Sequence, residues 1–192
     1  MLIRLSALVV LSLCLLVTGC GTIVSKTTGT NPVGTNASER SFGRLIDDQL
    51  IETYVSANIL KANEDFKDAN VSVTSYNGIV LLTGQVQSEQ LKQLASQTAK
   101  NVRNVRRVHN EISVAGPISI PARTNDSWLK TKIKSRMLAD KDTNPPRVKV
   151  VVENGVVYLM GMVHKTEADS AVEIAHKTYG VQKIVKVFEY TE

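Results

Sequence analysis

Two stretches of the chain carry the same alternation of apolar and polar positions. Residues 71–86 and 148–163 are identical at eight of sixteen positions when they are aligned at a constant offset of 77. Each stretch holds an Asn-Gly pair between two β-rich runs, at Asn77-Gly78 and at Asn154-Gly155. A type I′ turn needs positive φ at both central residues, and Asn-Gly meets this need well. The pattern therefore predicts a β-hairpin in each stretch and a chain built on an internal repeat.

A helical pattern of apolar positions precedes each hairpin. The spacing i, i+4, i+8 places these residues on one helix face. They are Ile51, Val55 and Ile59 in the first repeat and Leu129, Ile133 and Met137 in the second. Asp48 and Asp126 come just before these stripes, and we expect them to mark the helix N-termini.

A second helix and a last strand are predicted after each hairpin. Asn104 and Gly180 stand where these helices end, at a position that favours a left-handed residue. Each repeat is therefore expected to be an α-β-β-α-β unit of an α+β fold. A unit of this size has a marginal core, so we expect the repeats to pack on each other or on the linker. That linker, residues 115–124, contains Pro117 and Pro121 and is predicted to be extended.

The first twenty residues have the pattern of an export signal. Arg4 precedes an apolar stretch over residues 5–17, which is too short to cross a hydrocarbon core of ~30 Å as a helix. The stretch ends in Val-Thr-Gly-Cys20, which resembles a bacterial lipobox. We expect residues 1–19 to be removed as a signal peptide and Cys20 to be acylated. Residues 20–46, which start at this acylated cysteine, are expected to form a flexible tether. The alternative is an ordinary signal peptide with an incidental cysteine.

Repeat and signal together resemble a known family. An α-β-β-α-β unit with Val-x-Val, Asn-Gly-x-Val and Gly-x-Val is similar to a BON domain. Two such units behind a lipobox resemble the dual-BON outer-membrane lipoproteins of Gram-negative bacteria. The resemblance departs at Asn104, where BON domains usually carry Gly. It implies a first BON domain over residues 47–114 and a second over 125–192, each with a small mixed three-stranded sheet packed on two helices.

The same resemblance implies a location and a function. Asp after the acylated cysteine would retain a lipoprotein in the inner membrane, but here the residue is Gly21, so we expect the outer membrane. The family resemblance implies a lipoprotein facing the periplasm that binds anionic phospholipid, gathers at division sites and supports envelope integrity.

Composition and motifs provide no signature of an enzyme. Apolar residues make up 43% of the 192 residues and charged residues 21%, which is ordinary for a folded protein. His109, His164 and His176 are dispersed, and no metal-ligand spacing, nucleophile elbow or phosphate-binding glycine loop is present. We therefore expect no catalytic residues, no metal and no cofactor. The net charge of +5 is too weak to indicate nucleic-acid binding, and an exported protein would not meet nucleic acid.

The first helices of the two repeats differ in charge. Residues 47–60 carry three acids and no base, whereas residues 125–138 carry one acid and four bases. Trp128, the only tryptophan, lies ~140° from the centre of the apolar stripe on a helical projection. An outward indole beside cations is typical of helices at a membrane interface. The predicted phospholipid site is Trp128, Lys130, Lys132, Lys134, Arg136 and Leu138.

Two hypotheses of function remain open. In the first, the second BON domain binds anionic phospholipid such as phosphatidylglycerol or cardiolipin. In the second, Trp128 packs against the first repeat or the linker, and the protein is an adaptor that docks on envelope-assembly or cell-wall-remodelling machinery. Liposome sedimentation with and without anionic lipid separates them.

Overall fold

The computed structural model describes residues 42–115 and 120–191, which belong to one compact unit, residues 37–192. The predicted signal, Cys20 and most of the predicted tether lie outside the described residues. No described helix is both long enough and apolar enough to span a membrane.

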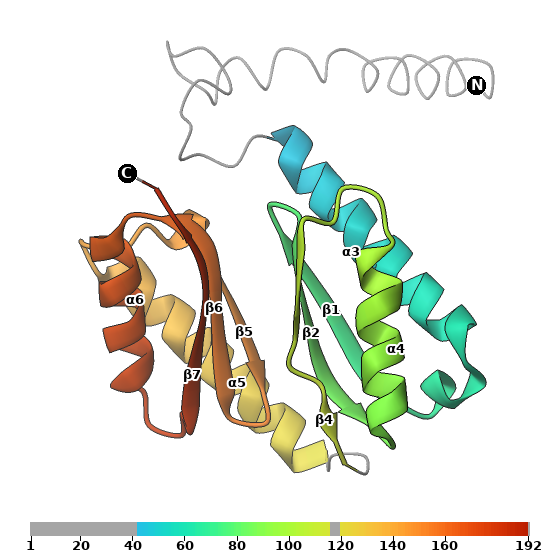
Figure 1. The fold of residues 1–192 in the computed structure, drawn as a ribbon. Coiled ribbons are helices and arrows are strands. Elements are labelled where there is room, and N and C mark those ends of the chain that lie inside the picture. The colour runs from blue at the N-terminus through green and yellow to red at the C-terminus, as the bar shows by residue number, and fades with distance from the viewer. Residues whose placement is uncertain (1–41, 116–119, 192) are drawn as a thin grey trace, which may run out of the picture. The chain divides into compact units, whose positions relative to one another are not determined.

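The first repeat is a small sheet with two helices on one face (Figure 1). Its central strand β2 pairs antiparallel with β1 and parallel with β3 and β4. The predicted last strand is thus divided into two short pieces. The elements in chain order are α3 (Phe42–Ala62), the 3₁₀ helix η1 (Glu64–Lys67), β1 (Asn70–Tyr76), β2 (Ile79–Val86), α4 (Glu89–Lys100), β3 (Arg107–Asn110) and β4 (Ser113–Val114).

The second repeat has the same order with an undivided last strand (Figure 1). Its sheet runs β5-β6-β7, with β5 and β6 antiparallel and β6 and β7 parallel. The elements are α5 (Ile120–Ala139), the 3₁₀ helix η2 (Pro145–Arg147), β5 (Val148–Glu153), β6 (Val156–Val163), α6 (Lys165–His176) and β7 (Lys183–Tyr190). The two tandem α+β units expected from the sequence are confirmed.

Both hairpin turns have the backbone that the Asn-Gly pairs predict. Asn77 and Gly78 have φ of 52° and 75°, and Asn154 and Gly155 have φ of 50° and 74°. Asn104 also adopts a left-handed φ of 67°, as Gly180 does at 99°. Asn104 thus adopts the left-handed backbone at a position where the resemblance leads us to expect Gly. Helices α4 and α6 end at Lys100 and His176, so Asn104 and Gly180 lie a few residues beyond the helix ends, not directly at them as the sequence predicts.

Both first helices begin earlier than the sequence predicts. Helix α3 begins at Phe42, inside the predicted tether, and α5 begins at Ile120, inside the predicted extended linker. Pro121 is compatible with this start because the first turn of a helix has no partner for its N–H groups. The prolines of the linker therefore do not keep its C-terminal half extended.

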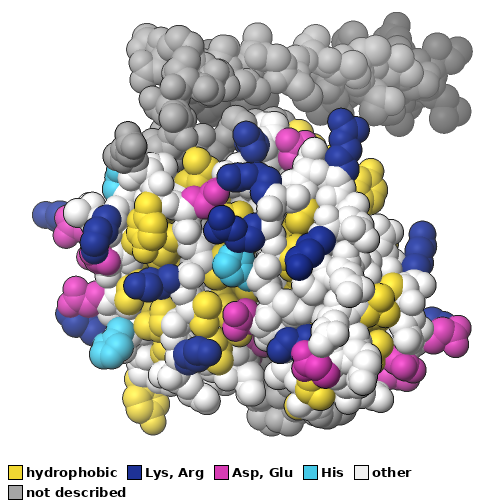
Figure 2. All heavy atoms as spheres, viewed as in Figure 1, with side chains coloured by type: hydrophobic (Ala, Val, Ile, Leu, Met, Phe, Trp, Pro, Cys, Tyr) yellow, Lys and Arg dark blue, Asp and Glu magenta, His cyan; other side chains and the backbone are white. Residues whose placement is uncertain are grey.

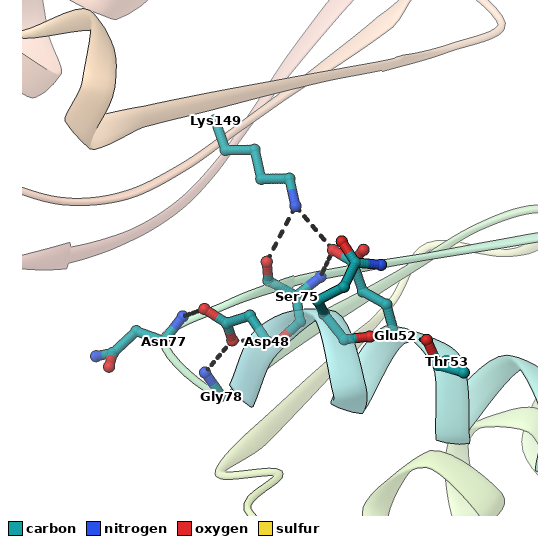
Figure 3. Close-up of polar contacts among 8 residues, drawn as sticks. Asp48, Glu52, Thr53, Ser75, Asn77, Gly78 and Lys149 are labelled. Atoms are coloured by element: carbon teal, nitrogen blue, oxygen red, sulfur yellow. Dashed lines mark hydrogen bonds and ion pairs between the residues drawn. The ribbon is translucent and has the colours of Figure 1, made fainter. Parts of the chain in front are cut away.

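Asp48 and Asp126 do not mark helix N-termini, so that prediction was wrong. Both lie inside their helices and are buried. Asp48 accepts hydrogen bonds from Asn77 N at 2.8 Å, Gly78 N at 2.9 Å and Ser75 Oγ at 2.6 Å (Figure 3). Asp126 accepts hydrogen bonds from the amides of Asn154 and Gly155. Each carboxylate thus joins the first helix of its repeat to the hairpin turn, which is why it recurs at the same place.

Each repeat has its own apolar core between helices and sheet. The predicted stripes of both first helices are buried, with exposures of 3% or less. A third cluster contains side chains from both sheets: Tyr76, Ile79 and Leu81 from the first and Tyr158, Met160 and Val187 from the second. The expected packing of the repeats on each other is therefore present.

Candidate functional site

Helix α5 buries one side in the core and exposes hydrophobic and basic side chains on other sides. Leu129, Ile133 and Met137 are at most 1% exposed and fix the rotation of the helix. As a result Trp128 is 50% exposed and Leu138 is 72% exposed. Trp128 is therefore at the surface, not enclosed between the repeats.

Lys132 accompanies Trp128 on this outward face. Its Nζ lies 4.3 Å from the centroid of the indole ring, which is a cation–π contact. The pair places an aromatic plane and a positive charge side by side, one turn apart on the helix. We define Trp128, Lys132 and Leu138 as the outward face of α5.

Lys130 and Lys134 belong to a different side of the helix. Both line a groove of about 340 Å³ together with Lys149 and with Glu52 from the first repeat. Lys149 Nζ lies 2.7 Å from Glu52 Oε1 and donates to Ser75 O at 3.2 Å (Figure 3). Lys130 and Lys134 are exposed and form no ion pair with any described residue.

Arg136 is held by the end of helix α6. Its Nη1 donates to Lys177 O at 2.9 Å and to Thr178 Oγ1 at 3.1 Å. A cation on the last carbonyls of a helix also complements the helix dipole. The structure therefore divides the six predicted site residues into an outward face, a groove side and one arginine that stabilises the domain.

A smaller apolar hollow adjoins the groove. It has a volume of about 260 Å³ and is lined by Lys134, Met137, Leu138, Pro145, Pro146 and Val148. Four of these, Lys134, Pro145, Pro146 and Val148, also line the groove. The sequence analysis did not identify Pro145, Pro146 and Lys149, because only folding brings η2 and β5 beside α5.

Charge of both signs is spread over the surface. On the face shown in Figure 2, Lys and Arg side chains lie among carboxylates and exposed hydrophobic side chains. The net charge of the chain therefore does not locate a site by itself. The contrast between α3 and α5 is the more specific signal.

Burial shifts the pKa values of two titratable side chains, His109 and Tyr158. Burial, followed by the nearby charge of Arg107, lowers the pKa of His109. Burial, with the charges of Glu111 and Glu153, raises the pKa of Tyr158 to about 12, so its hydroxyl stays protonated at neutral pH. No three His, Cys, Asp or Glu side chains in residues 42–115 and 120–191 gather to hold a metal ion.

Comparison with known proteins agrees with the fold. The BON domain family model matches residues 47–116 and 125–192. The chain is 40% identical over 153 residues to Outer membrane lipoprotein DolP of Haemophilus influenzae, covering 80% of this chain and 79% of that protein. It is 36% identical to the 21 kDa hemolysin of Actinobacillus pleuropneumoniae over the same shares.

A third relative is more distant. Osmotically-inducible protein Y of Escherichia coli is 30% identical, covering 78% of this chain and 75% of that protein. One of the three relatives is named a lipoprotein, and none of the three names states a catalytic activity. Two matched domains and a relative at 40% identity establish that the chain belongs to the BON-domain family, as a tandem BON protein similar to the outer-membrane lipoprotein DolP.

Proposed function

We propose that this protein is a lipid-anchored outer-membrane protein, facing the periplasm, that binds anionic phospholipid through helix α5 of its second BON domain. The observation that carries the proposal is the outward face of α5, where Trp128 is half exposed beside Lys132 and Leu138 projects from the same helix. In this proposal Cys20 supplies the anchor, and binding supports envelope integrity, including at division sites.

The chemistry of the outward face fits a membrane interface. Indole rings favour the depth of the lipid headgroups because they combine an apolar body with one N–H donor. Each basic residue near an anionic surface contributes about 1 kcal/mol. Lys132 Nζ lies 4.3 Å from the centroid of the indole ring, so the aromatic and electrostatic contributions act at the same place.

The anchor makes a weak contact sufficient. An acylated Cys20 would hold α5 close to the bilayer, so docking becomes an intramolecular step at high effective concentration. A few kcal/mol from the outward face then decides whether the domain lies on the membrane or stands away from it. Salt should weaken the docking because exposed charges are screened over ~8 Å at physiological ionic strength.

Vesicle sedimentation with two matched variants tests the proposal. Trp128→Glu and Leu50→Glu place the same charge at corresponding positions of α5 and α3, where the native side chains are 50% and 45% exposed. For residues 21–192, we expect Trp128→Glu to abolish binding to phosphatidylglycerol vesicles and Leu50→Glu to bind as the wild type does. Neutral phosphatidylcholine vesicles should bind neither the wild type nor the two variants. Undiminished binding by Trp128→Glu would overturn the assignment.

One observation favours the adaptor function as a second candidate. Helix α3 exposes an apolar stripe of Ile46, Leu50, Tyr54 and Leu60, each 45–55% exposed. Between residues 47 and 60 the sequence carries no base, so this stripe is suited to a protein rather than to an anionic membrane. If it docks a protein, Leu50→Glu should keep vesicle binding and fail to restore detergent resistance in a strain that lacks the protein.

A further inference from the structure

Two adjoining hollows beside helix α5 differ in chemistry. The smaller hollow is walled by Met137, Leu138, Pro145, Pro146 and Val148, with Lys134 as its only charged residue. The neighbouring groove is lined by three lysines, Lys130, Lys134 and Lys149, and Glu52 is the one acidic residue among its lining residues. Because Lys134 lines both spaces, the apolar hollow begins where the cationic groove ends.

We propose that this pair of hollows binds one molecule of an anionic phospholipid, with the phosphate on Lys130 and Lys134 and an acyl chain in the apolar hollow. The inference rests on the proposed function, since it takes the same ligand class. It adds a stoichiometric site that adjoins the outward face and shares only Leu138 with it. The membrane would then be contacted by Trp128 and Leu138 while one lipid is held beside them.

The charges of the groove fit a phosphate. Glu52 is neutralised by Lys149 at 2.7 Å, so that pair contributes little net charge. Lys130 and Lys134 are one helical turn apart in α5 and have no ion-pair partner among the described residues. In α3 the corresponding positions are Glu52 and Ser56, so this pair of lysines is particular to the second repeat.

The apolar hollow fits a hydrocarbon chain. Met137 and Val148, at 1% and 4% exposed, form its buried wall, and Leu138 lies at its exposed edge. Leu138 also belongs to the outward face, so a chain entering from the bilayer would pass directly beside it. A space of this size with one lysine at its rim suits a single chain better than a polar ligand.

Titration with a monomeric lipid tests this site separately from membrane adhesion. Residues 37–192 form a compact unit with their own cores, so the chain from residue 21 serves as the protein. Calorimetry with octanoyl and decanoyl lysophosphatidylglycerol, below their micelle concentrations, should show saturable binding of one lipid per protein. Each added methylene should tighten binding about fourfold until the hollow is filled. Glycerol phosphate, which has no chain, should bind too weakly to measure.

Variants place the site within the domain. Lys134→Glu should weaken lysophosphatidylglycerol binding tenfold or more, and Pro146→Phe should do the same by filling the apolar hollow. Lys141→Glu, the same charge reversal at an exposed lysine outside both hollows, should change it less than twofold. Thermal unfolding of each variant checks that it is folded. Because Lys134 is exposed, its replacement should leave the core intact.

The outcomes separate the two proposals. Trp128→Glu should lose vesicle binding and still bind lysophosphatidylglycerol in the titration. This result would support both membrane docking and the single-lipid site. Equal titrations for Lys134→Glu and Lys141→Glu, or no dependence on chain length, would overturn the single-lipid site while vesicle adhesion could stand. A normal titration in a protein that never sediments with vesicles would leave the single-lipid site in place and remove the membrane-docking function.

Discussion

Helices α3 and α5 hold the same place in two copies of one domain, yet they present different faces. Their buried stripes match, and the buried Asp of each accepts hydrogen bonds from its hairpin turn. Taking those two Asp as equivalent, Leu50 corresponds to Trp128, and Tyr54 corresponds to Lys132. The fold therefore fixes which positions point outward, and the residues at those positions decide what the helix can bind.

The largest expected effect comes from breaking what the two helices share. Asp48→Ala should lower the free energy of unfolding by about 3–4 kcal/mol, because it leaves two turn amides and a hydroxyl without an acceptor. Asp126→Ala should lower the free energy of unfolding by about 2–3 kcal/mol, because two backbone amides lose their hydrogen-bond acceptor. Urea unfolding followed by circular dichroism measures both values.

A neighbouring carboxylate provides the control for that experiment. Asp47 is exposed and next in sequence to Asp48, so Asp47→Ala should stay within about 0.5 kcal/mol of the wild type. Equal losses for Asp47→Ala and Asp48→Ala would show that the link between helix and turn does not stabilise the domain.

An intermediate effect is expected from exchanging outward residues between the repeats. Lys132→Tyr makes α5 resemble α3 and should weaken binding to phosphatidylglycerol vesicles about fivefold, the equivalent of about 1 kcal/mol for one lysine. Leu50→Trp with Tyr54→Lys gives α3 the aromatic-cation pair and should strengthen binding by a similar factor. Sedimentation at two salt concentrations measures both. A gain that does not decrease with salt would contradict the electrostatic explanation.

The smallest effect concerns a contact that joins the repeats. Arg106 Nη2 lies 2.8 Å from Glu189 Oε1, and the side-chain amide of Asn77 donates a hydrogen bond to the other oxygen of that carboxylate. Burial alone would raise the pKa of Glu189, but the hydrogen bonds from Arg106 and Asn77 hold it below its usual value. The contact therefore stabilises the fold above about pH 4.3, the ordinary Glu value, and is lost as pH falls through the lowered pKa.

Glu189→Gln tests that contact. Because Arg106 is half exposed, the variant should lose no more than about 1 kcal/mol at neutral pH, and the difference from the wild type should shrink in acid. Unfolding curves at neutral pH and near pH 3 provide the comparison. A difference that persists unchanged in acid would show that the carboxylate charge is not involved.

The sequence was sufficient for the type and order of most elements and for the outward position of Trp128, because these depend on local periodicity. The Asn-Gly turns and the two buried stripes follow from spacing alone. The roles of Asp48 and Asp126 could not be predicted from spacing, because a buried carboxylate that binds a turn far away in the sequence has no local sequence signature. An aspartate recurring before each Asn-Gly pair was the available clue.

The site was predicted only in part for the same reason. Helical projection separates Trp128 from the core stripe, but it cannot show that Arg136 reaches the end of α6 or that η2 lies beside Lys134. Those contacts depend on which elements pack together. Counting cations along one helix therefore grouped residues that the fold assigns to different tasks.

Fluorescence of the single tryptophan tests the central claim most directly. Trp128 is half exposed, so its emission in the free protein should be that of a hydrated indole, and phosphatidylglycerol vesicles should shift it to the blue. Moving the tryptophan to α3, with Trp128→Phe and Leu50→Trp, should abolish the shift. A blue emission in free protein that does not respond to anionic vesicles, or an equal shift from the tryptophan on α3, would contradict the assignment of α5 as the lipid-binding helix.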